Sequence, residues 1–216
     1  MQGRKLRLYE KKHRGQRGFV IGGGPSIRDI SPEIVEKLKQ EITVGSNHAF
    51  KLFEPTYLIF IDRGYWRTFN QDLKSLQKTI MFYPSKLTSV TIKNALQFPM
   101  GSEKNHPIAP EKWNDRVPTW NNAGVTAIRI ANIMGLNPIY LLGCDLDKDA
   151  KRRGETHFHD CYDEKRKNAT KPERYDKFKR AFVKTIAAMP KVEIVSCSKV
   201  SALNEYIPYV SLESVL

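Results

Sequence analysis

Short apolar runs along this chain alternate with segments in which apolar residues recur every three or four positions. The runs are typical of buried strands, and the recurring positions are typical of amphipathic helices. Because the two kinds of segment alternate, the sequence predicts an α/β fold: a mostly parallel sheet with helices on both faces. Strands are predicted at 19–21, 41–45, 56–61, 79–83, 138–142 and 192–195, and helices at 34–39, 66–73, 123–134 and 172–189, with a short helix beginning at 201.

Two segments interrupt this alternation. Residues 96–120 contain four prolines and few periodic apolar positions, which predicts a long loop or a lid. Residues 147–171 are polar and carry a pair of histidines, which predicts a second loop. We expect residues 18–216 to fold as a single domain, preceded by a basic arm or edge element at 1–17.

The formal net charge of +13 is large for 216 residues and favours a polyanionic partner: nucleic acid, a phosphorylated ligand or an anionic surface. The alternative is a charge that serves solubility alone. Basic side chains gather before the first strand and again after residue 147. The predicted nucleic-acid contacts are Arg4, Lys5, Arg7, Lys11, Lys12, Arg14, Arg17, Lys151, Arg152 and Arg153.

Composition also bears on location. No apolar run reaches the length of a membrane span, and the amino-terminal residues lack the apolar region of a signal peptide, so we expect neither. The cysteines, Cys144, Cys161 and Cys197, are too few and too scattered for a disulfide scaffold or a zinc site. The sequence therefore predicts a cytoplasmic protein.

The first predicted strand runs directly into Gly22-Gly23-Gly24-Pro25-Ser26. Glycines permit close approach of a ligand to the backbone, and Ser31-Pro32-Glu33 soon begins a helix. A strand, a glycine turn and a helix N-terminus together make an anion site, because free N–H groups and the helix dipole point at one place. The alternative is a tight turn without a ligand, since the segment matches neither GxGxxG nor a P-loop.

Polar residues follow the other predicted strands: Asn47 after the second, Asp62 after the third, and Asp145 and Asp147 after the strand at 138–142. Each has a simpler explanation as a cap or turn residue. Because ligands bind beyond the carboxyl ends of parallel strands, their combination predicts a nucleotide-type pocket. Asp145 and Asp147 have the DxD spacing with which nucleotide-sugar transferases hold Mg²⁺ or Mn²⁺ on a diphosphate.

The segment Thr156-His157-Phe158-His159-Asp160 is the most chemically distinctive part of the chain. Residues two apart point the same way on an extended segment, so His157 and His159 are predicted to face one pocket. Either imidazole could act as a general base towards a hydroxyl. A metal site would need a third ligand, for which Asp160 and Asp163 are candidates; the remaining alternative is a pair of surface histidines.

The order of these motifs resembles known families over roughly residues 18–210. It resembles the Campylobacter-type bacterial sialyltransferases, archaeal 6-hydroxymethylpterin diphosphokinase-like proteins and, most closely, small phage and prophage proteins. The residues that carry the resemblance are Gly22–Ser26, Asn47, Asn121-Asn122-Ala123-Gly124, Leu141–Asp145, the Asp62-Arg63-Gly64-Tyr65-Trp66 element and the loop Thr156–His159.

This resemblance implies a Rossmann-like, GT-A type fold that binds a UDP- or CMP-linked sugar. It implies that His157 or His159 is the catalytic base, and Asp62 joins them as a catalytic candidate. The sialyltransferases have no DxD where this chain has Asp145 and Asp147, so metal dependence stays open. The implied donor-binding residues are Gly22, Gly23, Gly24, Pro25, Ser26, Asn47, Asn121, Asn122, Gly124 and Asp145.

The leading hypothesis from the sequence is a glycosyltransferase that moves a sugar from a nucleotide donor to a hydroxyl. The basic charge and the phage-like resemblance favour a hydroxymethylated pyrimidine in DNA as the acceptor, in the cytoplasm of a bacterial host. The alternatives are a sialyltransferase-like enzyme acting on a glycan, a diphosphokinase acting on a pterin-like alcohol, and a basic nucleic-acid-binding module without catalysis.

Overall fold

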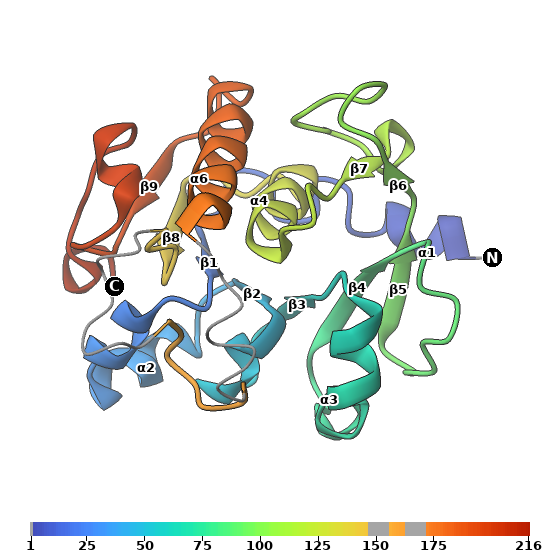
Figure 1. Ribbon diagram of the computed structural model, residues 1–216, viewed down its shortest axis with the longest axis horizontal. Helices are drawn as coiled ribbons and strands as arrows, with labels where there is room; N and C mark the ends of the chain where they lie inside the picture. The colour runs from blue at the N-terminus through green and yellow to red at the C-terminus, as the bar shows by residue number, and fades with distance from the viewer. Residues whose placement is uncertain (1, 147–155, 163–171) are drawn as a thin grey trace.

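The computed structural model describes residues 2–146, 156–162 and 172–216. Within these ranges, seven strands form one parallel sheet in the order β5-β4-β3-β2-β1-β8-β9 (Figure 1). The predicted fold class, a Rossmann-like α/β sheet, is confirmed. The strands are β1 (Gly18–Ile21), β2 (Thr43–Ser46), β3 (Tyr57–Ile59), β4 (Ile80–Pro84), β5 (Ala95–Phe98), β8 (Ile139–Leu142) and β9 (Ile194–Ser196).

Helices cover both faces of this sheet (Figure 1). One face carries α4 (Ala123–Ile133) and α6 (Pro172–Ala187), and the other carries α2 (Pro32–Leu38) and α3 (Arg63–Ser75). Across the described residues, no helix combines the length and the apolar composition needed to cross a bilayer. Short 3-10 helices occur at η1 (Pro25–Asp29), η2 (Asn47–Lys51), η3 (Trp113–Asp115), η5 (Ala202–Glu205) and η6 (Leu212–Val215).

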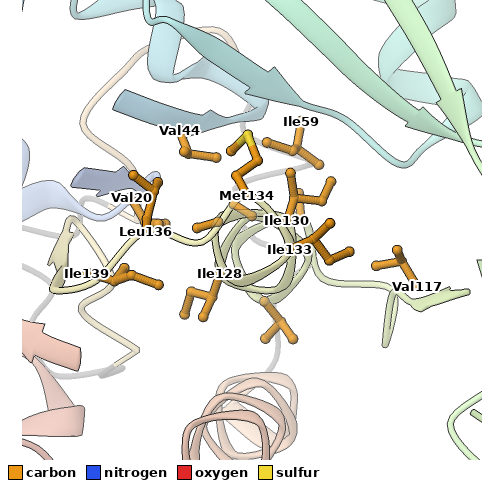
Figure 2. Close-up of a cluster of buried hydrophobic side chains, with 14 of the residues drawn as sticks. Val20, Val44, Ile59, Val117, Ile128, Ile130, Ile133, Met134, Leu136 and Ile139 are labelled. Carbon is orange, nitrogen blue, oxygen red and sulfur yellow. The ribbon is translucent and has the colours of Figure 1, made fainter. Parts of the chain in front are cut away.

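The two faces bury separate cores because successive side chains of a strand point to opposite sides. Val20, Val44 and Ile59 pack towards α4, whereas Phe19 and Leu58 pack towards α2 and α3. Figure 2 shows side chains of α4 and of the segment that follows it facing the strands. Nearly every residue of α4 is buried, as its apolar sequence predicts, so this helix has a fixed position on the sheet.

The segment predicted as a loop or lid, 96–120, has short regular elements at both ends, and residues 102–112 between them contain neither helix nor strand. Ala95–Phe98 pairs in parallel with β4 as the edge strand of the sheet. β6 (Met100–Gly101) pairs with β7 (Val117–Pro118), and Trp113 between them is 2% exposed. The sequence did not predict β5, because this strand is defined by its pairing with β4 and not by a periodic apolar pattern; a lid between β6 and β7 stays a prediction.

Residues 2–17 also belong to the folded structure. Helix α1 (Gln2–Arg7) contacts the edge strand β5, and Leu6 is 4% exposed. Further along, Tyr9 packs edge-on against Tyr57 and Phe82. Of the two sequence interpretations of this segment, an arm or an edge element, the described residues have the geometry of an edge element.

The strand order fixes where a ligand site is expected. From β1 the chain builds the sheet outward through β2, β3, β4 and β5, and then returns to place β8 on the other side of β1. At this reversal the connections after β1 and β8 leave in opposite directions, which opens a crevice at the carboxyl ends of the two strands. Open α/β sheets bind ligands at such a switch point.

Candidate functional site

A cavity of about 620 Å³ lies at the carboxyl ends of β1 and β8. Segments that are far apart in the sequence meet there: the glycine turn, the ends of β2, β3 and β8, the start of α4, the histidine segment and one face of α6. The lining residues include Gly22–Pro25, Ser46–His48, Asp62, Asn121–Gly124, Gly143–Leu146, Thr156, His157, His159, Tyr162, Arg174, Tyr175, Phe178 and Phe182.

The structural reason for glycine differs among the three positions of the turn. A Cβ atom on Gly22 would collide with the carbonyl of Gly143, and one on Gly24 would collide with the carboxylate of Asp145. At Gly23 the nearest atom would be Cδ2 of His157, at an ordinary contact distance of 3.4 Å. Gly22 and Gly24 therefore allow the turns after β1 and β8 to touch, and Gly23 leaves the cavity open beside His157.

Asp145 joins the turns after β1 and β8, which form the floor of the pocket. Its Oδ2 accepts a hydrogen bond from the Ser26 N–H at 2.9 Å, and its Oδ1 accepts from Ser26 Oγ at 2.6 Å and from Ser198 Oγ at 2.7 Å. The residue is 3% exposed. Ser26, predicted to bind the donor, is absent from the cavity lining and serves instead as a partner of Asp145.

These contacts bear on the predicted metal pair. Both carboxylate oxygens of Asp145 accept hydrogen bonds from hydroxyl and amide groups, and these bonds leave about one of the roughly four lone-pair sites of the carboxylate for a Mg²⁺ or Mn²⁺ ion. Asp147 lies outside the described residues. The structure therefore gives Asp145 a role that the DxD spacing did not indicate, and the metal pair stays a prediction.

Helix α4 begins in the pocket wall. The side chain of Asn122 caps it by accepting a hydrogen bond from the Val125 N–H at 3.1 Å, as the sequence predicts. The backbone N–H groups of Ala123 and Gly124 belong to the unpaired first turn, and we find no hydrogen-bond acceptor for them among the described residues. Both residues line the cavity, so the positive end of the helix dipole faces it.

Strained backbone concentrates at the same place. Asn47, Asn121 and Leu146 have φ angles of 48°, 50° and 53°, in the left-handed region, and all three line the cavity. Non-glycine residues keep such conformations only where the surroundings impose them, and they cluster at functional sites. The Oδ1 atom of Asn47 is buried and has no hydrogen-bond partner among the residues described.

The histidine segment supplies two different imidazoles. His159 is 8% exposed, and its burial, followed by the nearby His157, lowers its pKa to about 3. His157 is half-buried and accepts or donates a hydrogen bond with Thr156 Oγ1 at 2.9 Å. The two rings lie 5.2 Å apart and both line the cavity. As a base, His159 is too weak near neutral pH, so His157 is the better candidate.

Asp62 follows β3 and lies on the cavity lining with an exposed side chain. Desolvation by the pocket walls raises the pKa of its carboxyl, and the positive charges of Lys86 and Arg174 oppose this change. Asp160, one of the proposed third metal ligands, is absent from the cavity lining and forms an ion pair with Arg28 at 3.3 Å. Asp163, the other, lies outside the described residues.

Several lining residues were not predicted to belong to a site. Tyr175, Phe178 and Phe182 repeat at helical spacing on α6, which predicts a core-facing surface, and part of that surface instead forms a wall of the cavity. His48 follows Asn47 at the end of β2 and was noted only as a polar strand end. Its 1% exposure and its place in the lining depend on packing that the sequence does not display.

The predicted nucleic-acid contacts of the amino-terminal segment lie away from the cavity. Lys11, His13 and Gly15 donate backbone hydrogen bonds to the carbonyls of Ile133, Met134 and Gly135 at 2.8–2.9 Å, at the end of α4 opposite to Asn122. An eleven-residue helix separates the two places by about 16 Å. Arg17 pairs with Glu41, the Arg4 side chain is not described, and Lys151, Arg152 and Arg153 lie outside the described residues.

The chain is similar to a solved structure but matches no protein family. No protein-family model matches the chain, and no curated protein matches it. Among solved structures, the sialyltransferase CstII from Campylobacter jejuni, in complex with the substrate analogue CMP-3FNeuAc, is similar with a TM-score of 0.48 and 14% sequence identity. The alignment covers 90% of this chain and 85% of that chain.

Proposed function

We propose that this protein is a glycosyltransferase that binds a nucleotide-sugar donor in the cavity between β1 and β8 and passes the sugar to a hydroxyl group. The observation that carries the proposal is the convergence of an open glycine turn, a helix N-terminus and a histidine on one cavity. Its volume of about 620 Å³ falls inside the range of roughly 300–1,000 Å³ typical of small-molecule sites.

The phosphate subsite lies between the glycine turn and α4. The N–H groups of Ala123 and Gly124 and the dipole of α4 favour an anion there, and Arg174 on the facing helix adds a positive side chain to the same lining. Gly23 leaves room for the anion against the backbone. A phosphate or diphosphate bound here is the leaving group of the transfer.

The nucleoside subsite lies beside α6 and the end of β2. Tyr175, Phe178 and Phe182 offer aromatic surface for a base or ribose, and the buried Oδ1 of Asn47 offers an acceptor to an amino group or a hydroxyl. A ligand group that donates to this atom would remove the cost of an unpaired buried acceptor, which is about 1–3 kcal/mol.

In the transfer, the acceptor oxygen forms a bond to the anomeric carbon while the bond from that carbon to the phosphate oxygen breaks. His157 accepts the proton of the acceptor hydroxyl, and the nucleotide leaves with the bonding electron pair. Loss of a general base lowers turnover by roughly 10²–10⁴-fold, so His157→Ala should reduce turnover to that extent and leave donor affinity unchanged. Because both oxygens of Asp145 are engaged, we derive no step through Mg²⁺ or Mn²⁺.

The acceptor is a separate question. A hydroxymethylated pyrimidine in DNA stays a prediction, and Lys11, Lys12 and Arg14 lie near the end of α4 that is opposite to the cavity. A glycan hydroxyl uses the same chemistry. A diphosphokinase would place ATP in the same cavity with a pterin-like alcohol, and a binding module without catalysis would leave His157 without a role.

The proposal is tested by measuring thermal stabilisation with UDP-sugars, CMP-sugars and ATP, because a ligand that binds the folded state raises its stability. We expect one class of nucleotide sugar to stabilise the protein. Gly23→Ala should weaken that donor on the order of tenfold, because its methyl group enters the cavity beside His157. Gly64→Ala is the matched control: a Cβ there meets no atom within 4 Å, and donor affinity should be unchanged.

The donor identified in this way is then incubated with hydroxymethylated DNA, an oligosaccharide and a hydroxymethylpterin, and the products are identified by mass spectrometry. A mass increase of one sugar unit on any acceptor supports the proposal. Stabilisation by ATP alone with diphosphorylation of the pterin would replace it with the diphosphokinase, and stabilisation by none of the nucleotides would overturn both.

A further inference from the structure

Three side chains with nitrogen or sulfur donors meet at the edge of the cavity. His48 comes from η2 after β2, and His159 and Cys161 come from the histidine segment, more than 100 residues later in the chain. One ligand atom from each residue lies within 4.8 Å of the other two. The rings of His48 and His159 are 4.1 Å apart between centroids, and both residues line the cavity.

The donor set indicates the class of metal. Imidazole nitrogen and thiolate sulfur suit Zn²⁺, whereas Mg²⁺ and Ca²⁺ take oxygen ligands. Zinc bonds of about 2.0–2.3 Å place tetrahedral ligand atoms roughly 3.3–3.7 Å apart. The three ligand atoms are already within 4.8 Å of one another, so side-chain rotations that move them by about an ångström bring them to the distances of a zinc site.

The surroundings hold the imidazoles in place. The rings of Tyr65 and Phe69 contact His48 edge-on, with centroids at 4.9 and 4.4 Å, and Tyr162 contacts both histidines at 4.9 and 5.0 Å. The Cys161 N–H donates to Nδ1 of His159 at a long 3.3 Å, a hydrogen bond that a metal ion on this nitrogen would replace. Because packing already restricts the orientation of these rings, they lose less conformational freedom when they bind a metal, which favours binding.

We propose that His48, His159 and Cys161 form a zinc site with its fourth coordination position open to the cavity. Three protein ligands and one open position are the arrangement of catalytic rather than structural zinc. The open position accepts water or an oxygen of a bound ligand, and zinc there acts as a Lewis acid on that oxygen. The site is distinct from the predicted Asp145–Asp147 pair and uses neither Asp160 nor Asp163.

Cys161 differs from the other two cysteines in its surroundings. From their number and spacing, the sequence predicted no zinc site at the cysteines. In the structure, Cys161 lies beside a histidine two residues away and another from a distant strand end. Cys144 and Cys197 do not belong to this group of three ligand atoms.

The test is cobalt binding to tag-free, metal-depleted protein in the absence of nucleotide. Co²⁺ takes zinc sites and reports on them optically, so we expect about one ion per chain, tetrahedral visible bands and a thiolate-to-cobalt charge-transfer band. Zn²⁺ should displace it. Cys161→Ser should abolish the charge-transfer band and weaken binding by more than the roughly 10–100-fold typical of losing an outer-sphere partner. The matched control, Cys197→Ser, should keep both.

A second variant covers the possibility that one substitution unfolds the protein. His159→Gln should weaken cobalt binding. Any cobalt that still binds to this variant should keep the thiolate-to-cobalt band, because Cys161 is intact. Equal spectra and affinities for wild type and Cys161→Ser would overturn the proposal, as would the absence of any bound ion. Because no nucleotide is present, these outcomes are separate from the donor test. If the protein binds a donor but no cobalt, only the zinc site is disproved. If it binds cobalt but no donor, only the proposed function is disproved.

Discussion

At its amino end, helix α4 opens into the cavity, whereas its carboxyl end is covered by the amino-terminal segment. The N–H groups of Ala123 and Gly124 have no acceptor among the described residues. At the other end, backbone N–H groups of Lys11, His13 and Gly15 satisfy the carbonyls of Ile133, Met134 and Gly135. Both ends of a helix leave unpaired groups. Among the described residues, the last carbonyls of α4 all have donors, whereas at the amino end Asn122 caps Val125 and the N–H groups of Ala123 and Gly124 stay without an acceptor.

This difference separates two uses of the same helix. The covered end anchors the amino-terminal segment, and its basic side chains complement the negative end of the helix dipole. The uncovered end retains a positive potential in a cavity that a ligand can enter. Substitutions at the covered end should therefore change the free energy of unfolding, and substitutions at the open end should also change ligand affinity.

The largest effect is expected at Gly135, which has a φ of 80°. Gly135→Ala imposes a left-handed conformation on alanine, at a cost of roughly 1–2 kcal/mol, and its Cβ would lie 3.0 Å from Arg14 Cα. The free energy of unfolding, measured by urea denaturation, should fall by more than that cost, with donor affinity unchanged. Gly15→Ala is the control: its φ is 73° and its Cβ meets no atom within 4 Å, so it should show the conformational cost alone.

An intermediate effect is expected at the open end. Asn122→Ala removes the cap of α4 and should lower the free energy of unfolding by about 1 kcal/mol. Donor affinity should fall as well, since the first turn of the helix lines the cavity. Ser31 caps α2 by accepting from the Ile34 N–H at 3.4 Å, outside the cavity. If Ser31→Ala lowered donor affinity as much as Asn122→Ala, the open end would have no special role.

The smallest effect is expected from the pH dependence of His13. Burial lowers the pKa of its imidazole below the usual 6.5, and its Nε2 lies 2.6 Å from the Tyr57 hydroxyl. Between the lowered value and 6.5 the unfolded chain binds more protons, so the free energy of unfolding falls as pH drops below about 6.5. His13→Gln should remove the contribution of His13 to this part of the pH profile of urea unfolding, while His159, whose pKa is lowered to about 3, keeps its own contribution. An unchanged profile would contradict the assignment to His13.

The parts of the fold that were predicted correctly share a local origin. β1 and α4 have apolar patterns and flanking residues that specify them within a short window, and the cap at Asn122 follows from its identity and position. β5 lacks such a pattern: three of its four residues are only half-buried, and its pairing with β4 defines it. An edge strand of this kind depends on a neighbour that sequence periodicity does not reveal.

In the candidate site, too, features specified by a short stretch of sequence were predicted, and contacts between distant segments were not. The sequence placed Gly22–Gly24, Asn122 and Asp145 at one edge because strand ends of a parallel sheet converge there. It could not assign Asp145 its partner, because Ser26 is 119 residues away in the chain. The contact of His48 with His159 is likewise a product of packing between distant segments, and residue spacing carries no signal for it.

The hydrogen bonds around Asp145 also set an order of events during synthesis. Ser198 Oγ donates to its carboxylate, Ser201 Oγ donates to the Cys144 carbonyl at 2.7 Å, and the Ala202 N–H donates to the Asp145 carbonyl at 2.8 Å. All three donors follow the last strand of the sheet. A nascent chain that has already made the glycine turn, β8 and α6 still lacks the groups that fix the floor of the pocket. The hydrogen bonds that fix the floor of the pocket are therefore complete only after residue 202 has been added to the chain.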